Sequence, residues 1–266
     1  MWTRRDTFWL LDRTVSIRSQ SDSFSQRILD LFRHADPPFQ QARPRDTYAV
    51  AVEDGQIKIY RDCHHVETAV SLEMAVSAFL VDLNRHMLYS FEGFSAHAGV
   101  VANAAGEAVL FPGTSGAGKS TLTSAAVRAG FGYLSDEALC VDFGSTEALP
   151  YLKPVNLARW SRHRLAIDDR PDFELPVPPA DLGLLHDKPS RIAHVVQLER
   201  PAPLELVELP RSTSVGTLVK MSFTHYENPP ETFRTVTEIA RQSQSWMLRY
   251  DDPVEAAELL RDRLGS

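Results

Sequence analysis

The sequence predicts an α/β fold, with a mixed sheet, flanking helices and a small α+β unit at the N-terminus. Three observations favour this fold class. Two pairs of β-prone runs, in residues 47–60 and 96–111, are each joined by a short polar turn. Residues 72–88 carry apolar side chains at helical spacing. A strand-like run at residues 108–111 leads through a glycine-rich loop into a second stretch with helical spacing.

Length and composition favour one large domain with a smaller appended domain. The chain has 266 residues, of which 43% are hydrophobic, which is enough to bury a full core. We expect the small α+β domain in residues 1–90 and the larger domain, which carries the glycine-rich loop, in residues 91–266.

The N-terminal residues show both strand and helix patterns. Residues 7–17 alternate loosely between apolar and polar types, which favours a strand, and residues 21–34 have helical spacing. Asp54 and Gly55 lie between two β-prone runs, so residues 47–60 are predicted to form a hairpin. Residues 72–88 present one apolar helical face and are expected to close this domain.

The larger domain is expected to continue the sheet well beyond the glycine-rich loop. Asp252, Pro253 and Glu255 are typical of a helix N-terminus, so a helix is predicted over residues 253–264. Residues 168–190 contain many prolines and little periodicity, which predicts an irregular surface loop, either a lid or a plain connector. The other predicted elements are strands near residues 133–134, 139–143, 151–157, 192–198, 204–209 and 246–250, and a helix over residues 230–241.

Charge and cysteine content restrict the partners and the compartment. The net charge of -7 provides no positive field, so no nucleic acid is expected as a partner. Cys63 and Cys140 lie far apart, which fits a reducing cytoplasmic location. The apolar run after the N-terminus is too short for a signal peptide, and no membrane partner is expected. The hairpins offer edges for pairing between subunits, which keeps a homo-oligomer open.

The glycine-rich loop carries the strongest chemical signal in the chain. Residues 113–120 match the pattern G-x-x-x-x-G-K-[ST] in full. Glycines allow successive backbone N–H groups to curl around phosphate oxygens, and the dipole of the following helix favours the same anion. We therefore predict a bound nucleoside triphosphate, ATP, with Mg²⁺. The predicted contacts come from Gly113, Thr114, Ser115, Gly116, Ala117, Gly118, Lys119, Ser120 and Thr121.

Three side chains of this loop have distinct expected roles. Lys119 supplies a positive charge to the β- and γ-phosphates. The Ser120 hydroxyl is a ligand for Mg²⁺, which bridges phosphate oxygens. Thr121 lies on the first helical turn, within reach of the α-phosphate.

An acidic pair follows the loop at short range. Asp136 and Glu137 come soon after the predicted helix, where a returning strand would bring them beside the phosphates. One carboxylate can hold Mg²⁺ while the other accepts a proton from an attacking hydroxyl. Adjacent strand residues point to opposite faces, so both reach the site only at a strand end or turn. Taken alone, such a pair is usually a solvated surface feature, and His97 on the preceding strand is more often structural.

The arrangement resembles HPr kinase/phosphorylase and, more closely, the HPr-kinase-related serine kinases, of the A type, found in bacterial peptide-modification gene clusters. Residues 97–101, 113–120 and 135–138 carry the resemblance, and residues 153–157 extend it weakly. It implies a P-loop kinase core of the HPr kinase/PEP carboxykinase type. It also implies that Asp136 is the general base, that Glu137 helps to hold Mg²⁺, and that His97 assists the phosphate or the catalytic carboxylate.

The sequence also departs from this family. The acidic pair is Asp-Asp in the family and Asp-Glu here, and Thr121 stands where the parent enzymes usually have Glu. No counterpart of the Arg-Gly-Leu-Gly segment is present, which puts HPr as substrate and the reverse phosphorolysis in doubt. Candidates for further charge stabilisation are Lys153, which is the best placed, and Arg159, Lys188 and Lys220.

These features together predict a catalytic role and leave two alternatives. The predicted function is an ATP-dependent serine kinase that transfers the γ-phosphoryl group to a peptide or protein serine. One alternative is a switch or scaffold that binds ATP without phosphorylating a partner. The other is a kinase that acts on the free hydroxyl of a small metabolite.

Overall fold

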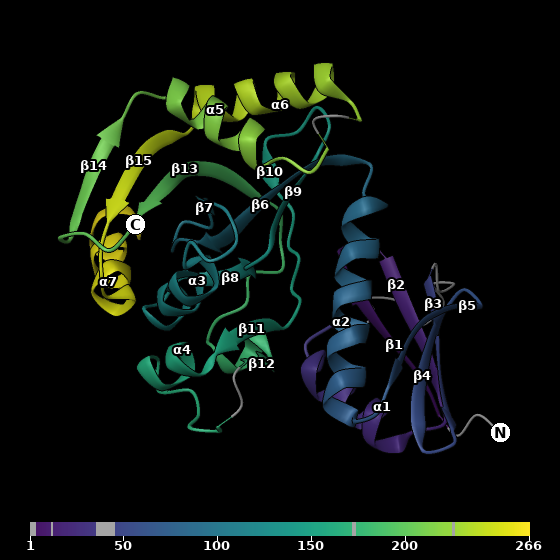
Figure 1. The fold of residues 1–266 in the computed structure, drawn as a ribbon. Coiled ribbons are helices and arrows are strands. Elements are labelled where there is room, and N and C mark those ends of the chain that lie inside the picture. Colours follow the sequence, from purple (N-terminus) through teal and green to yellow (C-terminus); the bar gives the residue numbers. More distant parts are fainter. Residues whose placement is uncertain (1–3, 12, 36–45, 172–173, 225–226) are drawn as a thin grey trace. The chain divides into compact units, whose positions relative to one another are not determined.

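The computed structural model describes residues 4–11, 13–35, 46–171, 174–224 and 227–266. They fall into two compact units, Met1–Ser90 and Phe91–Ser266, each of mixed α/β structure (Figure 1). The predicted fold class is therefore confirmed at this level: mixed sheets with flanking helices. Among the described residues, no helix has both the length and the apolar character needed to cross a membrane.

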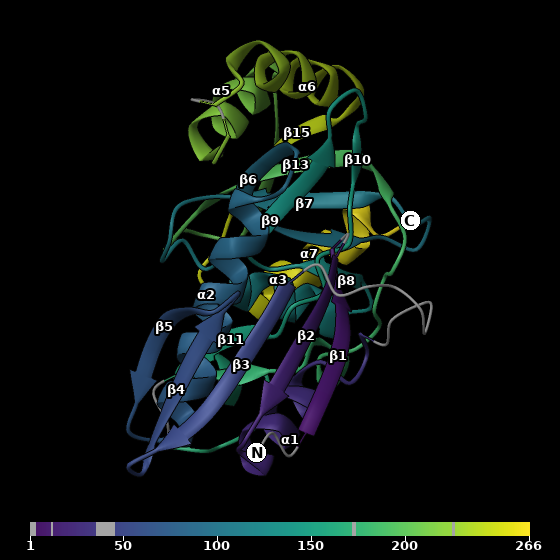
Figure 2. The ribbon, with the colours of Figure 1, turned by 90° about the vertical axis from the view of Figure 1, so that its right-hand side faces the viewer.

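The first unit contains a five-stranded sheet with the order β1-β2-β3-β4-β5 (Figure 2). Neighbouring strands are antiparallel except for β2 and β3, which are parallel. Phe79 of one helix packs edge-on against Phe24 of the other and against Tyr48 of the sheet, so both helices share one core. The elements are β1 (Arg4–Leu10), β2 (Arg13–Ser19), α1 (Asp22–Leu31), β3 (Asp46–Glu53), β4 (Gln56–Arg61), β5 (His64–Ala69) and α2 (Leu72–Tyr89).

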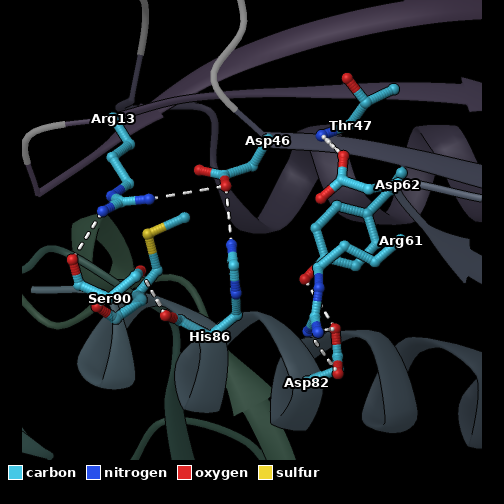
Figure 3. Close-up of polar contacts among 10 residues, drawn as sticks. Arg13, Asp46, Thr47, Arg61, Asp62, Asp82, His86 and Ser90 are labelled. Atoms are coloured by element: carbon cyan, nitrogen blue, oxygen red, sulfur yellow. Dashed lines mark hydrogen bonds and ion pairs between the residues drawn. The ribbon is translucent and has the colours of Figure 1, made fainter. Parts of the chain in front are cut away.

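Polar side chains also tie helix α2 to the sheet (Figure 3). Arg61 of β4 donates to both carboxylate oxygens of Asp82, at 2.7 and 2.8 Å. His86 Nε2 lies 2.7 Å from Oδ1 of the buried Asp46, and Arg13 donates to the carbonyl of Ser90 at 2.6 Å. These contacts join strands β2, β3 and β4 to one face of α2.

Two predictions for this unit are corrected by the structure. The single strand predicted for residues 7–17 is wrong, because β1 and β2 form an antiparallel hairpin with Leu11 at its turn. No glycine or asparagine marks the turn in the sequence, and Leu11 turns the chain at φ 57°. Strand β5 was not predicted. The predicted hairpin at 47–60 and helix at 72–88 are confirmed as β3–β4 and α2.

The second unit is built on an eight-stranded sheet. Its main order is β14-β15-β13-β7-β6-β8, with β9 also paired to β6 and β10 to β13. Strand β13 is parallel to β7 and β15, and the other pairs are antiparallel. The strands are β6 (Gly93–Ala102), β7 (Ala108–Pro112), β8 (Gly132–Ser135), β9 (Ala138–Asp142), β10 (Glu147–Ala148), β13 (Ser190–Glu199), β14 (Glu205–Leu209) and β15 (Gln244–Arg249).

Helices cover both faces of this sheet (Figure 1). Helices α3 (Lys119–Arg128) and α7 (Pro253–Leu264) pack on one face, through an apolar cluster that includes Leu122 and Leu260. Helices α5 (Ser212–Met221) and α6 (Pro229–Gln242) pack on the other, through Leu218 and Ile239. Because side chains alternate along β6, Val100 contributes to the second cluster and Val101 to the first.

A small appendage lies outside this sheet and carries further corrections. Among the described strands, β11 (Val155–Ala158) pairs only with β12 (Glu174–Val177). The strand predicted for 151–157 is therefore shorter and belongs to a separate two-stranded sheet. The loop predicted for 168–190 contains β12 and a short 3₁₀ turn, Pro179–Asp181, so it is not wholly irregular. Residues 172–173 of that prediction lie outside the described residues. Helices α4 (Arg159–Arg164) and α5 were not predicted.

Candidate active site

Strand β6 brings the glycine-rich loop and the acidic pair together. On one side it pairs with β7, and the backbone N–H of Gly113, at the end of β7, donates to the carbonyl of His97 at 3.2 Å. On its other side β6 pairs with β8 and then β9, with His97 opposite Ala138. The acidic residues stand in the bend between β8 and β9. His97 therefore lies between the start of the loop and the end of the acidic pair.

The loop adopts the backbone conformation that its glycines allow. Gly116 and Gly118 have φ values of 81° and 91°, a left-handed region that is costly for residues with a side chain. Gly118 is the residue before helix α3, so the first N–H groups of the helix face the loop. A helix of ten residues with an open N-terminus and a preceding glycine turn provides a ready site for an anion.

Lys119 is held along the loop. Its ammonium donates to the carbonyl of Thr114 at 2.8 Å, and the residue is only 5% exposed. Burial lowers the pKa of Lys119, although the nearby carboxylates of Glu137 and Asp136 act in the opposite direction. The lysine is thus a partly desolvated cation, and charge interactions are stronger there than in bulk water.

Asp136 is a buried carboxylate with fixed partners. It is 2% exposed, and its Oδ1 lies 3.1 Å from the ammonium of Lys153 and 3.2 Å from the hydroxyl of Tyr133. The same tyrosine hydroxyl is 3.0 Å from the carbonyl of Lys153. Burial alone would lower the pKa of Lys153, but the carboxylates of Asp136 and Glu137 outweigh it and raise that pKa. Lys153 consequently stays charged and fixes the position of Asp136.

Glu137 is the more accessible acid of the pair. Its side chain is 36% exposed, and its carboxylate oxygens lie 3.7 Å from Lys153 Nζ and 3.7 Å from His97 Nε2. Burial and the charge of Asp136 raise the pKa of Glu137, against the lowering effect of Lys153. A carboxylate that is destabilised by its own desolvation gains from a cation placed beside it.

His97 is neutral at physiological pH. Burial is the main reason that its pKa falls to about 4, and the cations Lys119 and Lys153 lower it further. The contact between His97 and Glu137 is therefore not an ion pair at pH 7. The imidazole is tilted against the ring of Phe223, with the ring centroids 5.9 Å apart. His97 can act as a hydrogen-bonding group in the site but not as a source of charge.

The predicted side chains surround a cleft of about 560 Å³. Gly113, Thr114 and Ala117 belong to the loop but do not line this cleft, and neither do Arg159, Lys188 or Lys220. The lining residues of the cleft that the sequence predicted are His97, Ser115, Gly116, Gly118, Lys119, Ser120, Thr121, Asp136 and Glu137. A second group of lining residues was not predicted as part of the site: Asn156, Ala158, Trp160, Ser161, Glu174 and Arg200.

Asn156 belongs to the stretch 153–157 that weakly extends the family resemblance, but it had no assigned role. The other residues of the second group were missed by sequence reasoning because they match no local motif. Ser161 of α4 shares a hydrogen bond of 2.8 Å with the hydroxyl of Thr121, which attaches α4 to the first turn of α3. Arg200 covers Gly118 so closely that a methyl group there would meet its guanidinium at 2.7 Å. The guanidinium of Arg200 also lies over the ring of Tyr250, 5.4 Å from its centroid. Arg200 thus adds a second cation at the loop.

The oxygen donors in the cleft suit a magnesium ion that is shared with a nucleotide. Within the described ranges, no group of three or more His, Cys, Asp or Glu side chains could hold a metal ion. Mg²⁺, however, is usually bound by one or two carboxylates together with substrate phosphates and water. The Ser120 hydroxyl and the Glu137 carboxylate both line the cleft and match that pattern.

No model of a known protein family matches the sequence, and no curated protein matches it either.

Proposed function

We propose that this chain is an ATP-dependent kinase that transfers the γ-phosphoryl group of ATP to a serine hydroxyl of a peptide or protein. The observation that carries the proposal is a cleft lined both by residues of the glycine-rich loop and by Asp136, whose carboxylate Lys153 holds in place. A site that only binds nucleotide commonly has one carboxylate for Mg²⁺, and this cleft has a second one, Asp136, that can accept a proton from an acceptor hydroxyl. The choice of serine as acceptor, and of a core of the HPr kinase/PEP carboxykinase type, rests on the sequence resemblance.

Each residue of the cleft has a role in the proposed reaction. The loop N–H groups, Lys119 and Arg200 bind and neutralise the phosphates. Ser120 and Glu137 would hold Mg²⁺, which when bound neutralises charge on the phosphate oxygens. His97, being neutral, offers a hydrogen bond without adding charge.

Asp136 accepts the proton of the acceptor hydroxyl in the proposed reaction. The acceptor hydroxyl oxygen forms a bond to the γ-phosphorus while the bond from that phosphorus to the β,γ-bridging oxygen breaks, and the electron pair leaves with ADP. The hydroxyl proton passes to the Asp136 carboxylate. The products are ADP and phosphoserine, so each turnover consumes one ATP for each phosphate transferred.

The test compares Asp136→Asn with the matched control Asp142→Asn, which removes an exposed carboxylate at the end of β9. Wild type is incubated with Mg·ATP and a library of serine-containing peptides, and phosphoserine is read by mass spectrometry. We expect Asp136→Asn to lose about 10²- to 10⁴-fold of the transfer rate, as for removal of a general base, and to retain ATP binding. Asp142→Asn should retain both.

The outcomes separate the kinase from its alternatives. Transfer by Asp136→Asn at the wild-type rate would rule out the assigned base. Binding of ATP with no phosphopeptide from any library member would favour a nucleotide-dependent switch. Acceptor-dependent ADP release with free hydroxy compounds, but not with peptides, would identify a small-metabolite kinase.

A further inference from the structure

Trp160 is a large aromatic side chain that the core does not use. It lies on α4, is 53% exposed and lines the nucleotide cleft. Leu157 and Leu165, on either side of it in the sequence, are buried in the apolar cluster beneath α3, whereas Trp160 is not part of that cluster. A single exposed aromatic side chain needs no explanation by itself, but one that lines a cleft is placed to contact a ligand bound there.

The backbone under Trp160 is held rigidly. The neighbouring Arg162 is fully buried, and it donates to the carbonyl of Leu157 at 2.6 Å and to the carboxylate of Asp168 at 3.0 Å. Ser161 is bonded to Thr121 of the loop helix at 2.8 Å. The indole is therefore presented from a fixed support, which reduces the entropy that a bound ligand would have to overcome.

Trp160 stands at the opposite end of the cleft wall from the catalytic carboxylate. The wall is strand β11, which begins two residues after Lys153 and ends two residues before Trp160. Val155 and Leu157 of this strand face the core, whereas Asn156 and Ala158 line the cleft. Four strand residues span about 10 Å from first to last, which separates the indole from the end of the cleft that is lined by Asp136, whose carboxylate Lys153 contacts.

The direction of a bound nucleotide follows from this layout. In the proposed reaction the γ-phosphate must face Asp136, and the loop N–H groups hold the phosphates behind it. The ribose and base then extend away from Asp136, towards Ser161 and Trp160. An aromatic side chain is well suited to that place, because every base offers a flat π-face for stacking.

We infer that Trp160 is the base platform of this site, stacking on the base of a nucleoside triphosphate. The inference rests on the proposed function, since it needs the γ-phosphate to point at Asp136. It adds a ligand class: nucleoside triphosphates bind more tightly than inorganic tripolyphosphate, and stacking alone does not choose among the bases.

The experiment measures binding of ATP, GTP and inorganic tripolyphosphate, each with Mg²⁺, by calorimetry to full-length wild type, Trp160→Ala and Trp160→Phe. The control is Phe233→Ala, which removes an aromatic side chain of α6 that is 60% exposed and outside the cleft. Loss of one stacking contact predicts about 5- to 150-fold weaker binding of ATP and GTP to Trp160→Ala. Tripolyphosphate binding should be unchanged, and Trp160→Phe should retain most of the affinity for both nucleotides.

Each outcome bears on the inference in one direction. Equal loss of ATP and tripolyphosphate affinity in Trp160→Ala, or no loss of either, would overturn the base platform. An altered Michaelis constant for the peptide acceptor with unchanged ATP affinity would place Trp160 in the acceptor site and also overturn it. If the alanine variant does not fold, Trp160→Leu gives the same test: it has no aromatic face, so it should weaken ATP and GTP binding and leave tripolyphosphate binding unchanged. The proposed function fails separately, if wild type binds no ATP or Asp136→Asn retains transfer.

Discussion

At the scale of single residues, the low pKa of His97 makes stability depend on pH. The pKa is about 4 in the folded protein because of burial and of the cations Lys119 and Lys153, against about 6.5 in an unfolded chain. Below pH 6.5 the unfolded state takes up the proton first, so stability from this residue is present above pH 6.5 and is lost as the pH falls towards 4. The full loss corresponds to about 3 kcal/mol.

We therefore predict that His97→Gln, an uncharged substitute, has a smaller loss of stability in acid than wild type. The free energy of unfolding in urea is measured at pH 7 and pH 4.5 for both proteins, and other titrating groups contribute to both. Wild type should lose about 2 to 3 kcal/mol more than His97→Gln over this interval. Parallel pH profiles for the two proteins would show that His97 takes up its proton as readily in the folded state.

Lys153 and Asp136 form an ion pair whose partners are 8% and 2% exposed. Removing one partner of a buried pair leaves an uncompensated charge, which typically costs about 3–5 kcal/mol. We expect Lys153→Met to lose stability in this range at pH 7, as measured by urea denaturation. The double variant Lys153→Met with Asp136→Asn should recover much of the loss, because it leaves no charge at Asp136.

This double-variant cycle also isolates the positioning role of Lys153. If the two single losses simply add in the double variant, the charges do not interact and Lys153 does not position Asp136. For a residue that acts through Asp136, the double variant should lose much less stability than the two single losses together. Lys153→Met should then also lose transfer but keep ATP binding.

The sequence identified the residues of this site that share a local pattern. The loop from 113 to 120 encodes its own conformation, and the acidic pair follows it closely enough to be found by position. Arg200 and Trp160 have no such signal, because their place in the cleft depends on β13 and α4 meeting the loop in space. The pKa of His97 likewise depends on burial and on Lys153, which lies more than 50 residues away in the chain.

At the scale of elements, the packing of α3 on β6 depends on the absence of a side chain at Gly99. A methyl group at this position would overlap the hydroxyl of the buried Thr123 on α3. We predict that Gly99→Ala destabilises the protein by about 1–3 kcal/mol, the usual cost of overpacking. It should also weaken nucleotide binding, because relief of this overlap would displace α3, the helix that follows the glycine-rich loop.

The matched control is Gly216→Ala. Gly216 is an exposed residue within α5, and nothing lies within 4 Å of an added methyl group. Alanine is a better helix former than glycine, so this variant should be about 0.5–1 kcal/mol more stable than wild type. Thermal denaturation of both variants shows directly whether each is less or more stable than wild type. A Gly99→Ala protein as stable as wild type would mean that Thr123 moves aside at no cost.

Element predictions succeeded where periodicity and turn chemistry agreed. Helix α7 carries its cap at Asp252, whose carboxylate accepts from the N–H groups of Val254 and Glu255, and it was predicted at its observed bounds. The turn at Leu11 and the strand β12 were missed, because neither has glycine or alternation to mark it. In β12 the strand is defined by its pairing with β11, which is a tertiary contact.

At the scale of the whole molecule, the chain consists of two units that each have a sheet and covering helices. Both apolar clusters on the faces of the eight-stranded sheet are made of residues from Phe91–Ser266. Every described residue that lines the cleft beside the glycine-rich loop comes from the same unit. Core and site of the larger unit therefore depend on its own residues.

We predict that a protein consisting of residues 91–266 folds and binds Mg·ATP. Its affinity should lie within about tenfold of that of the full chain, a difference of about 1.4 kcal/mol, because no cleft residue is lost. The complementary fragment, residues 1–90, should bind no nucleotide. Circular dichroism and a cooperative thermal transition establish folding, and calorimetry gives the affinity. A folded 91–266 fragment without ATP binding would show that the first unit supplies a nucleotide contact, whereas binding without peptide phosphorylation would assign that unit to the acceptor.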